Sequence, residues 1–186
     1  MPRPGIDREQ LMSAITSVFA ARGFEGATMA ELSRATGLRK ASLYHHFPGG
    51  KLEMLGAVIR ATVALLESDV FGQLQSHRSP GNRLLRMLDG FDTYCESGQR
   101  SCVLAVIAHS TAADEFKDGI SSQFQSWTHQ LEQTLHEIGY GDKRSARVAR
   151  EILATLYGSL TTSRLLDDPA VYTQAVKRLR KQVAVA

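Results

Sequence analysis

Hydrophobic residues along this chain recur at intervals of three and four positions, which is the period of an α-helix. Alternation of polar and apolar residues, typical of a half-buried β-strand, is absent over any useful length. The first helical segment follows Asp7, a residue type favoured as an N-cap, and Gly23 is expected to end it. Further helical segments are expected over residues 29–35, 40–46, 51 to beyond 66, 84–94, 103–113, 116–138, 145–166 and 171–181. The pattern therefore predicts an all-α fold.

Two short helices near the N-terminus are joined by a tight turn. Thr28 precedes the first of them and Glu31 follows three residues later, which is the spacing of a capping box. Gly37 stands where the turn needs a positive φ angle, a conformation that glycine adopts without steric cost. Leu38 and Leu43 are placed to pack against the first helix. This pattern is typical of a helix-turn-helix, whose second helix enters the major groove of DNA.

The second short helix carries side chains that suit contact with DNA. Arg39 and Lys40 lie at its N-terminal end, where cationic groups and backbone N–H groups favour phosphate. No acidic residue occurs between Glu31 and Glu53, a gap that a surface facing phosphate would favour. The residues that this reasoning expects to contact DNA are Thr28, Arg39, Lys40, Ser42, Tyr44, His45 and Lys51. Thr28 and Lys51 flank the helix and are expected to hold the DNA backbone on either side.

Composition permits this function without demanding it. The 186-residue chain is 43% hydrophobic and 22% charged, as a globular protein is, and its net charge is +3. Most of the positive excess lies in residues 1–55, where seven Lys and Arg residues face five Asp and Glu residues. Apolar runs are too short to span a bilayer, and no apolar segment follows the charged N-terminus. We therefore expect a soluble, cytoplasmic protein with no membrane partner.

Other function classes lack their motifs in this sequence. There is no glycine-rich phosphate loop, no G-x-S-x-G and no H-E-x-x-H, so an enzyme is not expected. His109, His129, His136 and the two cysteines have no metal-ligand spacing, and neither a metal site nor another cofactor is expected. Cys95 and Cys102 are expected to be buried thiols, and a redox role for them stays open.

The N-terminal residues resemble a known family. F-A-x-x-G-F-x-G-A-T-M-x-E-L-S-x-A-T-G begins at Phe19, and K-A-S-L-Y-H-H-F-P begins at Lys40. Together they resemble the DNA-binding domain of TetR-type transcriptional regulators. The resemblance implies a recognition helix at about residues 40–46, with Thr28 and Lys51 on the DNA backbone. The residues that it implies face DNA are Lys40, Ala41, Ser42, Tyr44 and His45. Gly49-Gly50 departs from the family by lengthening the loop before Lys51.

The later part of the chain is similar to a subgroup related to the LmrA/YxaF regulators. The similarity rests on P-G-G-K at Pro48, S-C-V-L-A-V-I-A at Ser101, F-x-x-W at Phe124 and L-Y-G-S-L at Leu156. It implies a helix-turn-helix domain over residues 1–50. Residues 51–186 are then a helical domain for effector binding and dimerisation.

Two sets of residues in that helical domain are candidates for ligand binding and for dimerisation. Large or soft side chains of the middle helices are expected to line an apolar pocket: Met87, Phe91, Tyr94, Cys95, Phe116, Phe124 and Trp127. The candidates for contact between two copies are Ile152, Leu156, Ser159 and Leu160. Each set has a plainer alternative, because aromatic stripes and leucines at helical spacing also form the core of a single subunit.

The sequence thus predicts a homodimeric regulator that binds double-stranded operator DNA. The resemblance implies a repressor, released from a palindromic operator by a small, largely apolar ligand. The alternative is a dimeric DNA-binding regulator with no small-molecule effector. Operator, target genes and effector are not identified by any residue pattern.

Overall fold

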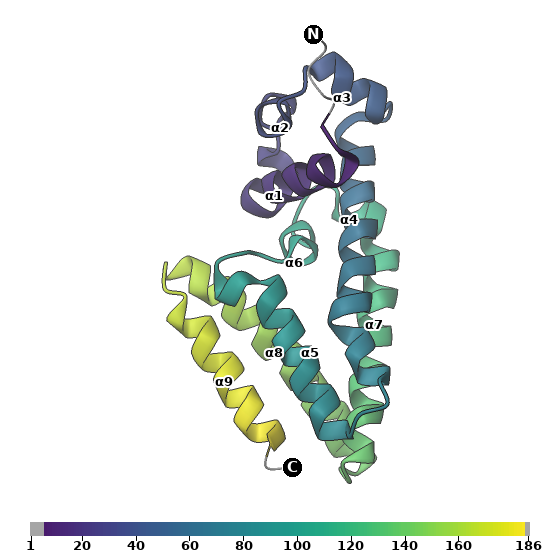
Figure 1. Cartoon of the computed structure of the whole chain (residues 1–186), viewed down its shortest axis with the longest axis vertical. Helices are drawn as coiled ribbons and strands as arrows, with labels where there is room; N and C mark the ends of the chain where they lie inside the picture. The colour runs from purple at the N-terminus through teal and green to yellow at the C-terminus, as the bar shows by residue number, and fades with distance from the viewer. Residues whose placement is uncertain (1–5, 185–186) are drawn as a thin grey trace. The chain divides into compact units, whose positions relative to one another are not determined.

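The computed structural model describes residues 6–184, which are helical throughout apart from turns and loops (Figure 1). The α-helices are α1 (Arg8–Gly26), α2 (Met29–Thr36), α3 (Lys40–His46), α4 (Gly50–Asp69), α5 (Pro80–Tyr94), α6 (Val103–Ile107), α7 (Ala113–Glu137), α8 (Asp142–Leu165) and α9 (Ala170–Ala184). Short 3-10 helices at η1 (Phe71–Gln75) and η2 (Glu96–Gly98) were not predicted. The all-α prediction is confirmed. No helix in the described part of the chain is long and apolar enough to cross a membrane.

The chain folds into two compact units. We call the first the head unit; it comprises the chain up to Thr62 together with Val103–Asp118. The second, the body unit, comprises Val63–Cys102 and the chain from Gly119 onward. The long helices α4 and α7 contribute residues to both. A functional boundary at residue 50 stays a prediction, since the head unit extends beyond it and takes in a segment from mid-chain.

The core of the head unit is built by the apolar stripe of α1. Leu11, Ile15 and Phe19 are buried there, as their spacing predicts. α1 packs against α2 and against α6. Gly23 breaks the helical path with φ 68° and ψ −176°, and the chain resumes a helical turn to Gly26. The expected stop at Gly23 is therefore a kink. Phe24 beyond it stacks on Phe19, with ring centroids 6.4 Å apart.

The mid-chain segment of the head unit carries a short helix. The sequence predicts a longer helical segment over residues 103–113, but α6 ends at Ile107 and a turn follows. Thr111 in that turn donates to Glu25 Oε1 from both its backbone N and its Oγ1, each at 2.7 Å. These two hydrogen bonds, the backbone one first, hold the pKa of Glu25 below its usual value. The turn is thus hydrogen-bonded to the last turn of α1.

In the body unit, α9 packs against α8 and α5. Arg180 of α9 binds two carboxylates of α5, with Nη2 at 2.9 Å from Asp89 Oδ1 and 3.0 Å from Asp92 Oδ2. α5 passes very close to the end of α4: a Cβ at Gly90 would lie 2.4 Å from the carbonyl oxygen of Asp69. Only glycine allows that approach, so Gly90 sets the packing of these two helices.

Candidate nucleic-acid interface

The turn of the helix-turn-helix is held by short polar side chains. Thr28 caps α2, because its Oγ1 accepts a hydrogen bond from Glu31 N at 3.2 Å. Gly37 has φ 68°, the left-handed conformation that the sequence predicts. Thr36 Oγ1 donates to Leu32 O at 2.8 Å and accepts from Leu38 N at 3.3 Å. Ser33 Oγ donates to Leu38 O across the same turn. The angle at which α3 leaves α2 is therefore set by local hydrogen bonds.

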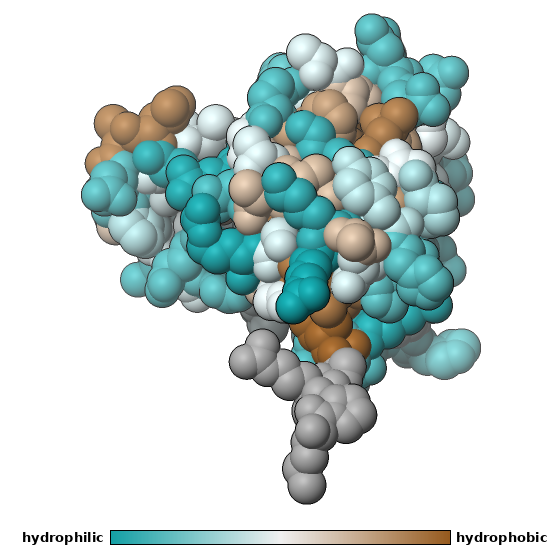
Figure 2. Space-filling view, turned by 90° about the horizontal axis from the view of Figure 1, so that it is seen from above, coloured by the Kyte–Doolittle hydropathy of each residue, from teal (hydrophilic) through white to brown (hydrophobic). Residues whose placement is uncertain are grey.

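α3 presents one face outward. Leu43 is fully buried and anchors the helix to the head core. Arg39, Lys40, Ala41 and His45 are exposed, and Tyr44 keeps 48% of its surface in solvent. Figure 2, which looks onto α2 and α3, shows a mostly hydrophilic face. Lys40, Ala41, Tyr44 and His45 follow helical spacing, and Ser42 is half-buried beside them.

The two carboxylates nearest to α3 in sequence are both occupied. Glu31 binds Arg34, with Nη1 3.0 Å from Oε1, rather than closing the second half of the capping box. Glu53 accepts from Gly49 N, at 2.6 Å from Oε2. α3 itself carries no acidic residue. Exposed donors on α3 thus face solvent with no carboxylate among them, which suits contact with phosphates and with the acceptor atoms of base edges.

Unlike the candidates on α3, Lys51 forms a hydrogen bond with another residue of the head unit. Its Nζ donates to Phe24 O at 2.8 Å and sits 4.1 Å from the centroid of the Phe24 ring. In the loop that precedes Lys51, Gly50 has φ 68°, a conformation that favours glycine, and it is the first residue of α4. Since an ammonium group has three N–H donors, Lys51 can still donate to a phosphate. Its role on DNA stays a prediction.

The body unit holds a continuous aromatic cluster, formed by Phe71, Phe91, Phe124, Trp127 and Tyr157. The Trp127 ring stacks on Phe71 at 4.2 Å between centroids. Phe124 contacts Trp127 and Tyr157, each at 5.2 Å, and Tyr157 contacts Phe91 at 5.2 Å. Sequence reasoning missed Tyr157 as a member, although it lies within the L-Y-G-S-L motif.

Glu67 accepts a hydrogen bond from Trp127 and so helps to hold its ring in this cluster. Its Oε2 accepts from Trp127 Nε1 at 2.6 Å and from Gln123 Nε2 at 3.1 Å. Its Oε1 accepts a longer bond, 3.4 Å, from Gln130 Nε2. A half-buried carboxylate with three donors is well satisfied, so Glu67 joins α4 to α7 inside the body unit. No pattern in the sequence marks Glu67, because its partners lie more than 50 residues away.

The structure separates the seven predicted ligand residues into two groups. Met87, Phe91, Tyr94, Cys95 and Trp127 are buried and Phe124 is half-buried, all within the body unit. Phe116 belongs to the head unit, where a ring atom lies 3.3 Å from the position that a Cβ on Gly56 would take. Whether any of these residues line a ligand site stays a prediction.

The two cysteines lie among tyrosines that are buried or half-buried. Tyr94 OH is 3.8 Å from Cys102 Sγ, which in turn is 3.9 Å from Tyr157 OH. Burial raises the pKa of the Cys95 thiol and of the Tyr94 and Tyr157 hydroxyls. A protonated, fully buried Cys95 is a poor nucleophile, as the expectation of buried thiols implies. No group of His, Cys, Asp or Glu within residues 6–184 is arranged to hold a metal ion.

The residues expected at a dimer contact are mostly interior. Ile152, Leu156 and Leu160 are buried within the single chain, and Ser159 is half-buried with its Oγ bonded to Leu156 O at 3.2 Å. Packing inside one subunit accounts for the burial of these leucines and of Ile152.

The second helix of the helix-turn-helix presents cationic side chains to solvent, and a larger helical unit follows it. This is the architecture of a DNA-binding protein. Residues 11–58 match the family model of bacterial regulatory proteins of the tetR family. Residues 83–178 match the C-terminal domain model of LmrA/YxaF-like transcriptional regulators. The chain therefore belongs to the TetR family of DNA-binding transcriptional regulators, in its LmrA/YxaF-like branch.

Individual relatives agree with this assignment. The HTH-type transcriptional regulator LmrA of Bacillus subtilis is 20% identical over 163 residues, which cover 86% of this chain and 87% of LmrA. A TetR regulator from Legionella pneumophila has the same fold, with a TM-score of 0.78, 18% identity and 98% of each chain covered. AibR in complex with isovaleryl coenzyme A and operator DNA superposes with a TM-score of 0.63 at 20% identity, covering 81% of this chain and 85% of AibR.

Proposed function

We propose that this regulator is a repressor that binds a palindromic operator as a homodimer and leaves it when a small, largely apolar ligand binds. The observation that carries the proposal is the outward face of α3. It presents Lys40, Tyr44 and His45 to solvent, and the nearest carboxylates are engaged elsewhere. Such a regulator acts on chromosomal DNA and hence in the cytoplasm.

On the operator, α3 would lie in the major groove. Lys40, Ala41, Ser42, Tyr44 and His45 would face base edges and nearby phosphates. Two other cationic groups, Arg39 at the N-cap of α3 and Lys51 at the start of α4, would contact the DNA backbone with Thr28. A dimer would present its two copies of α3 about 34–36 Å apart, one turn of the double helix.

The homodimer contact is proposed on the outward face of α8. Ala154, Gly158 and Thr162 follow one another at four-residue spacing on that face and are exposed in the single chain. Small side chains let two helices approach closely, and Ser159 lies at the edge of the stripe. Ile152, Leu156 and Leu160 would then support the interface from inside the subunit.

The effector is proposed to enter the aromatic cluster of the body unit. Predominantly aromatic and aliphatic surroundings favour an apolar ligand, and Glu67, Tyr94 and Tyr157 offer a few polar groups to orient it. AibR, a protein of the same fold, was crystallised with an acyl-coenzyme A and operator DNA together.

One observation favours a second candidate, a regulator with no small-molecule effector. Trp127, Phe91 and Met87 have no exposed surface, so the cluster packs as a core does. A thermal-shift screen separates the two functions, since a ligand that binds only the folded state raises its melting temperature. A ligand that raises the melting temperature and releases DNA supports the repressor. A screen of apolar compounds without one supports the second candidate.

The experiment that tests operator binding is an anisotropy titration of the purified protein against its own upstream DNA. It is run with competitor DNA and at two salt concentrations. Tight binding that survives competitor is expected. Weak binding that falls with salt and ignores sequence would leave only a nonspecific electrostatic attraction, and would contradict the proposal.

A further inference from the structure

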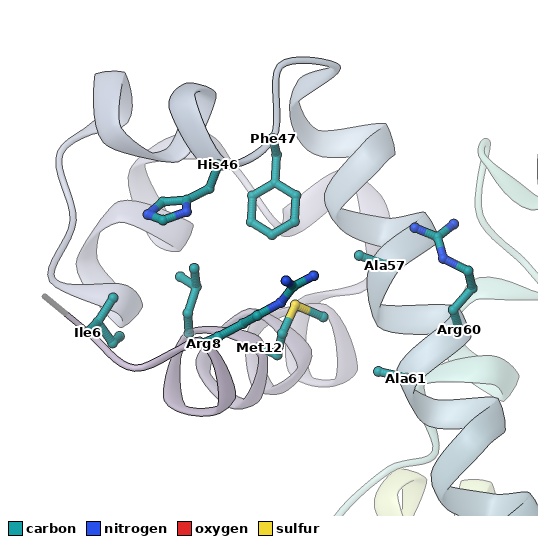
Figure 3. Close-up of a pocket in the computed structure, with 9 residues that line it drawn as sticks. Ile6, Arg8, Met12, His46, Phe47, Ala57, Arg60 and Ala61 are labelled. Carbon is teal, nitrogen blue, oxygen red and sulfur yellow. The ribbon is translucent and has the colours of Figure 1, made fainter.

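A hollow of about 550 Å³ lies within the head unit, between α1, the end of α3 and the middle of α4 (Figure 3). Its size is within the range of small-molecule sites in proteins. Apolar side chains make most of its wall: Leu11 and Met12 from α1, Phe47 after α3, and Ala57 and Ala61 from α4. We call it the head hollow.

Three basic side chains also line the head hollow. Arg8 extends along α1 beneath the Phe47 ring, and His46 points from the end of α3 toward α1 (Figure 3). Arg60 also borders the hollow from α4, but its guanidinium lies on the side of α4 away from Ala57 and Ala61 (Figure 3), with Nη1 3.3 Å from the position that a Cβ on Gly56 would take. None of these three side chains forms a hydrogen bond or an ion pair with another residue in the range 6–184. The residues lining the hollow include no Asp or Glu.

An apolar wall with the Arg8 guanidinium and the His46 ring, neither of which has a carboxylate partner within residues 6–184, suits an amphipathic anion. A carboxylate would accept paired hydrogen bonds from a guanidinium, which are stronger than hydrogen bonds between neutral groups. An aliphatic chain would lie against Met12 and Ala57, which are half-buried, and Ala61, which is exposed, and would remove their remaining apolar surface from water. Both parts of the hollow are then used by one molecule.

We propose that the head hollow is a binding site for a small organic monoanion, a carboxylate with an aliphatic body. The site is separate from the aromatic cluster, which belongs to the body unit. Because His46 and Phe47 form part of its wall, an occupant also fixes the end of α3 against α1. That second consequence rests on the proposed DNA-binding role of α3, whereas binding of the anion does not.

The direct test is calorimetric titration of the full chain, without DNA, using sodium octanoate. Octanol and octyltrimethylammonium serve as the neutral and cationic probes. Octanoate is expected to bind, and the other two to bind at least about tenfold more weakly, because they lose the charge-assisted hydrogen bonds. No heat from octanoate, or equal binding of all three probes, overturns the proposal.

Two variants locate the site. Arg8→Gln is expected to lower the affinity for octanoate about tenfold, and Ala61→Leu to abolish binding by filling the hollow. Both positions are exposed, so both variants are expected to fold, and a thermal melt of each checks this. Matched controls are Arg22→Gln on α1 and Ala64→Leu on α4, which are exposed and do not line the hollow. Undiminished octanoate binding by both site variants would place the ligand elsewhere and overturn the proposal.

The consequence for α3 is tested separately by operator titrations with and without octanoate. Octanoate is expected to change the operator affinity of the wild type and to leave that of Ala61→Leu unchanged. By linkage, the operator must change octanoate affinity by the same factor. An effect of octanoate that persists in Ala61→Leu contradicts the coupling, whereas failure of operator binding itself would leave the calorimetric result standing.

Discussion

Side chains around the turn of the helix-turn-helix fall into two groups. Some stabilise the turn, and others face outward from α3. Thr36 and Ser33 form local hydrogen bonds, and Gly37 adopts the left-handed conformation of the turn. Lys40 and Tyr44 make no such contact and remain available. Since the two roles fall on different residues, substitution of an outward-facing residue is expected to change DNA affinity with little effect on folding.

Lys40→Ala and Tyr44→Ala are expected to weaken operator binding while the melting temperature stays within a degree or two of the wild type, as for most surface substitutions. If Lys40 contacts a phosphate, its loss also lowers the slope of log affinity against log salt by about 0.9. The measurement is fluorescence anisotropy over a range of salt. Lys143→Ala, an exposed lysine of the body unit, is the control. Wild-type affinity in both α3 variants would show that α3 is not the reading helix.

Thr28→Ala removes the cap of α2, and we expect the free energy of unfolding to fall by about 1 kcal/mol. Urea denaturation measures the loss. Thr28→Ser keeps a hydroxyl that can accept from Glu31 N and is expected to recover most of it. Equal losses in both variants would mean that the hydroxyl does not act as the cap.

At the scale of elements, segments distant in sequence are joined by single carboxylates. Glu25 joins the last turn of α1 to the turn after α6, and Glu67 joins α4 to α7. Each accepts more than one hydrogen bond, so each substitution removes several contacts at once. Neither contact could be predicted from the helix propensity of the segments that it joins.

The Glu25 tie predicts a pH dependence. Its folded-state pKa is depressed by Thr111, so its contribution to stability is present above the unfolded pKa and is lost as pH falls through the folded one. Wild type and Glu25→Gln are therefore expected to differ in unfolding free energy at neutral pH and to converge at acid pH, below the usual range for Glu. Chemical denaturation at a series of pH values measures this. A difference that stays constant down to acid pH would contradict the assignment.

Glu67→Ala is expected to leave the buried Trp127 N–H without an acceptor and to lower stability by about 1–3 kcal/mol. Trp127 is the one tryptophan of the chain, so its fluorescence reports the change directly during urea unfolding. Glu67→Gln retains a carbonyl acceptor and serves as the control. If the two variants unfold at the same urea concentration, the acceptor role of Glu67 is disproved.

At the scale of the whole molecule, the outward face of α8 exposes small and apolar side chains that residues 6–184 of the single chain leave uncovered. A Cβ on Gly158 would meet no atom within 4 Å, and Leu165 and Leu166 at the end of α8 are 81% and 64% exposed. Exposed leucines next to a stripe of small side chains fit a contact with a second copy. The proposed palindromic operator would match the two-fold symmetry of such a dimer.

Gly158→Arg is expected to give a folded monomer that binds the operator at least about tenfold more weakly, since the two half-sites are no longer bound together. Sedimentation velocity and anisotropy measure the two effects. Gly119→Arg is the matched control, because a Cβ on that helical glycine of α7 also meets nothing within 4 Å. A Gly158→Arg protein that still sediments as a dimer would exclude this face.

The sequence by itself determined the helix-turn-helix, because local signals define every part of it. The cap at Thr28, the left-handed Gly37 and the buried Leu43 act within a few residues of their own positions. The long helices were likewise predicted within a few residues at most ends, since their apolar stripes repeat at the helical period. The family followed from the same residues.

Only the tertiary structure decided which segments share a unit. Nothing local in 103–118 assigns it to the head unit, and nothing in Phe116 separates it from the other predicted ligand residues. The partners of Glu67, the bridging position of Tyr157 and the head hollow also depend on contacts across tens of residues. Helical periodicity tells which face of a helix is apolar, but the partner that covers this face is chosen by packing of the whole chain.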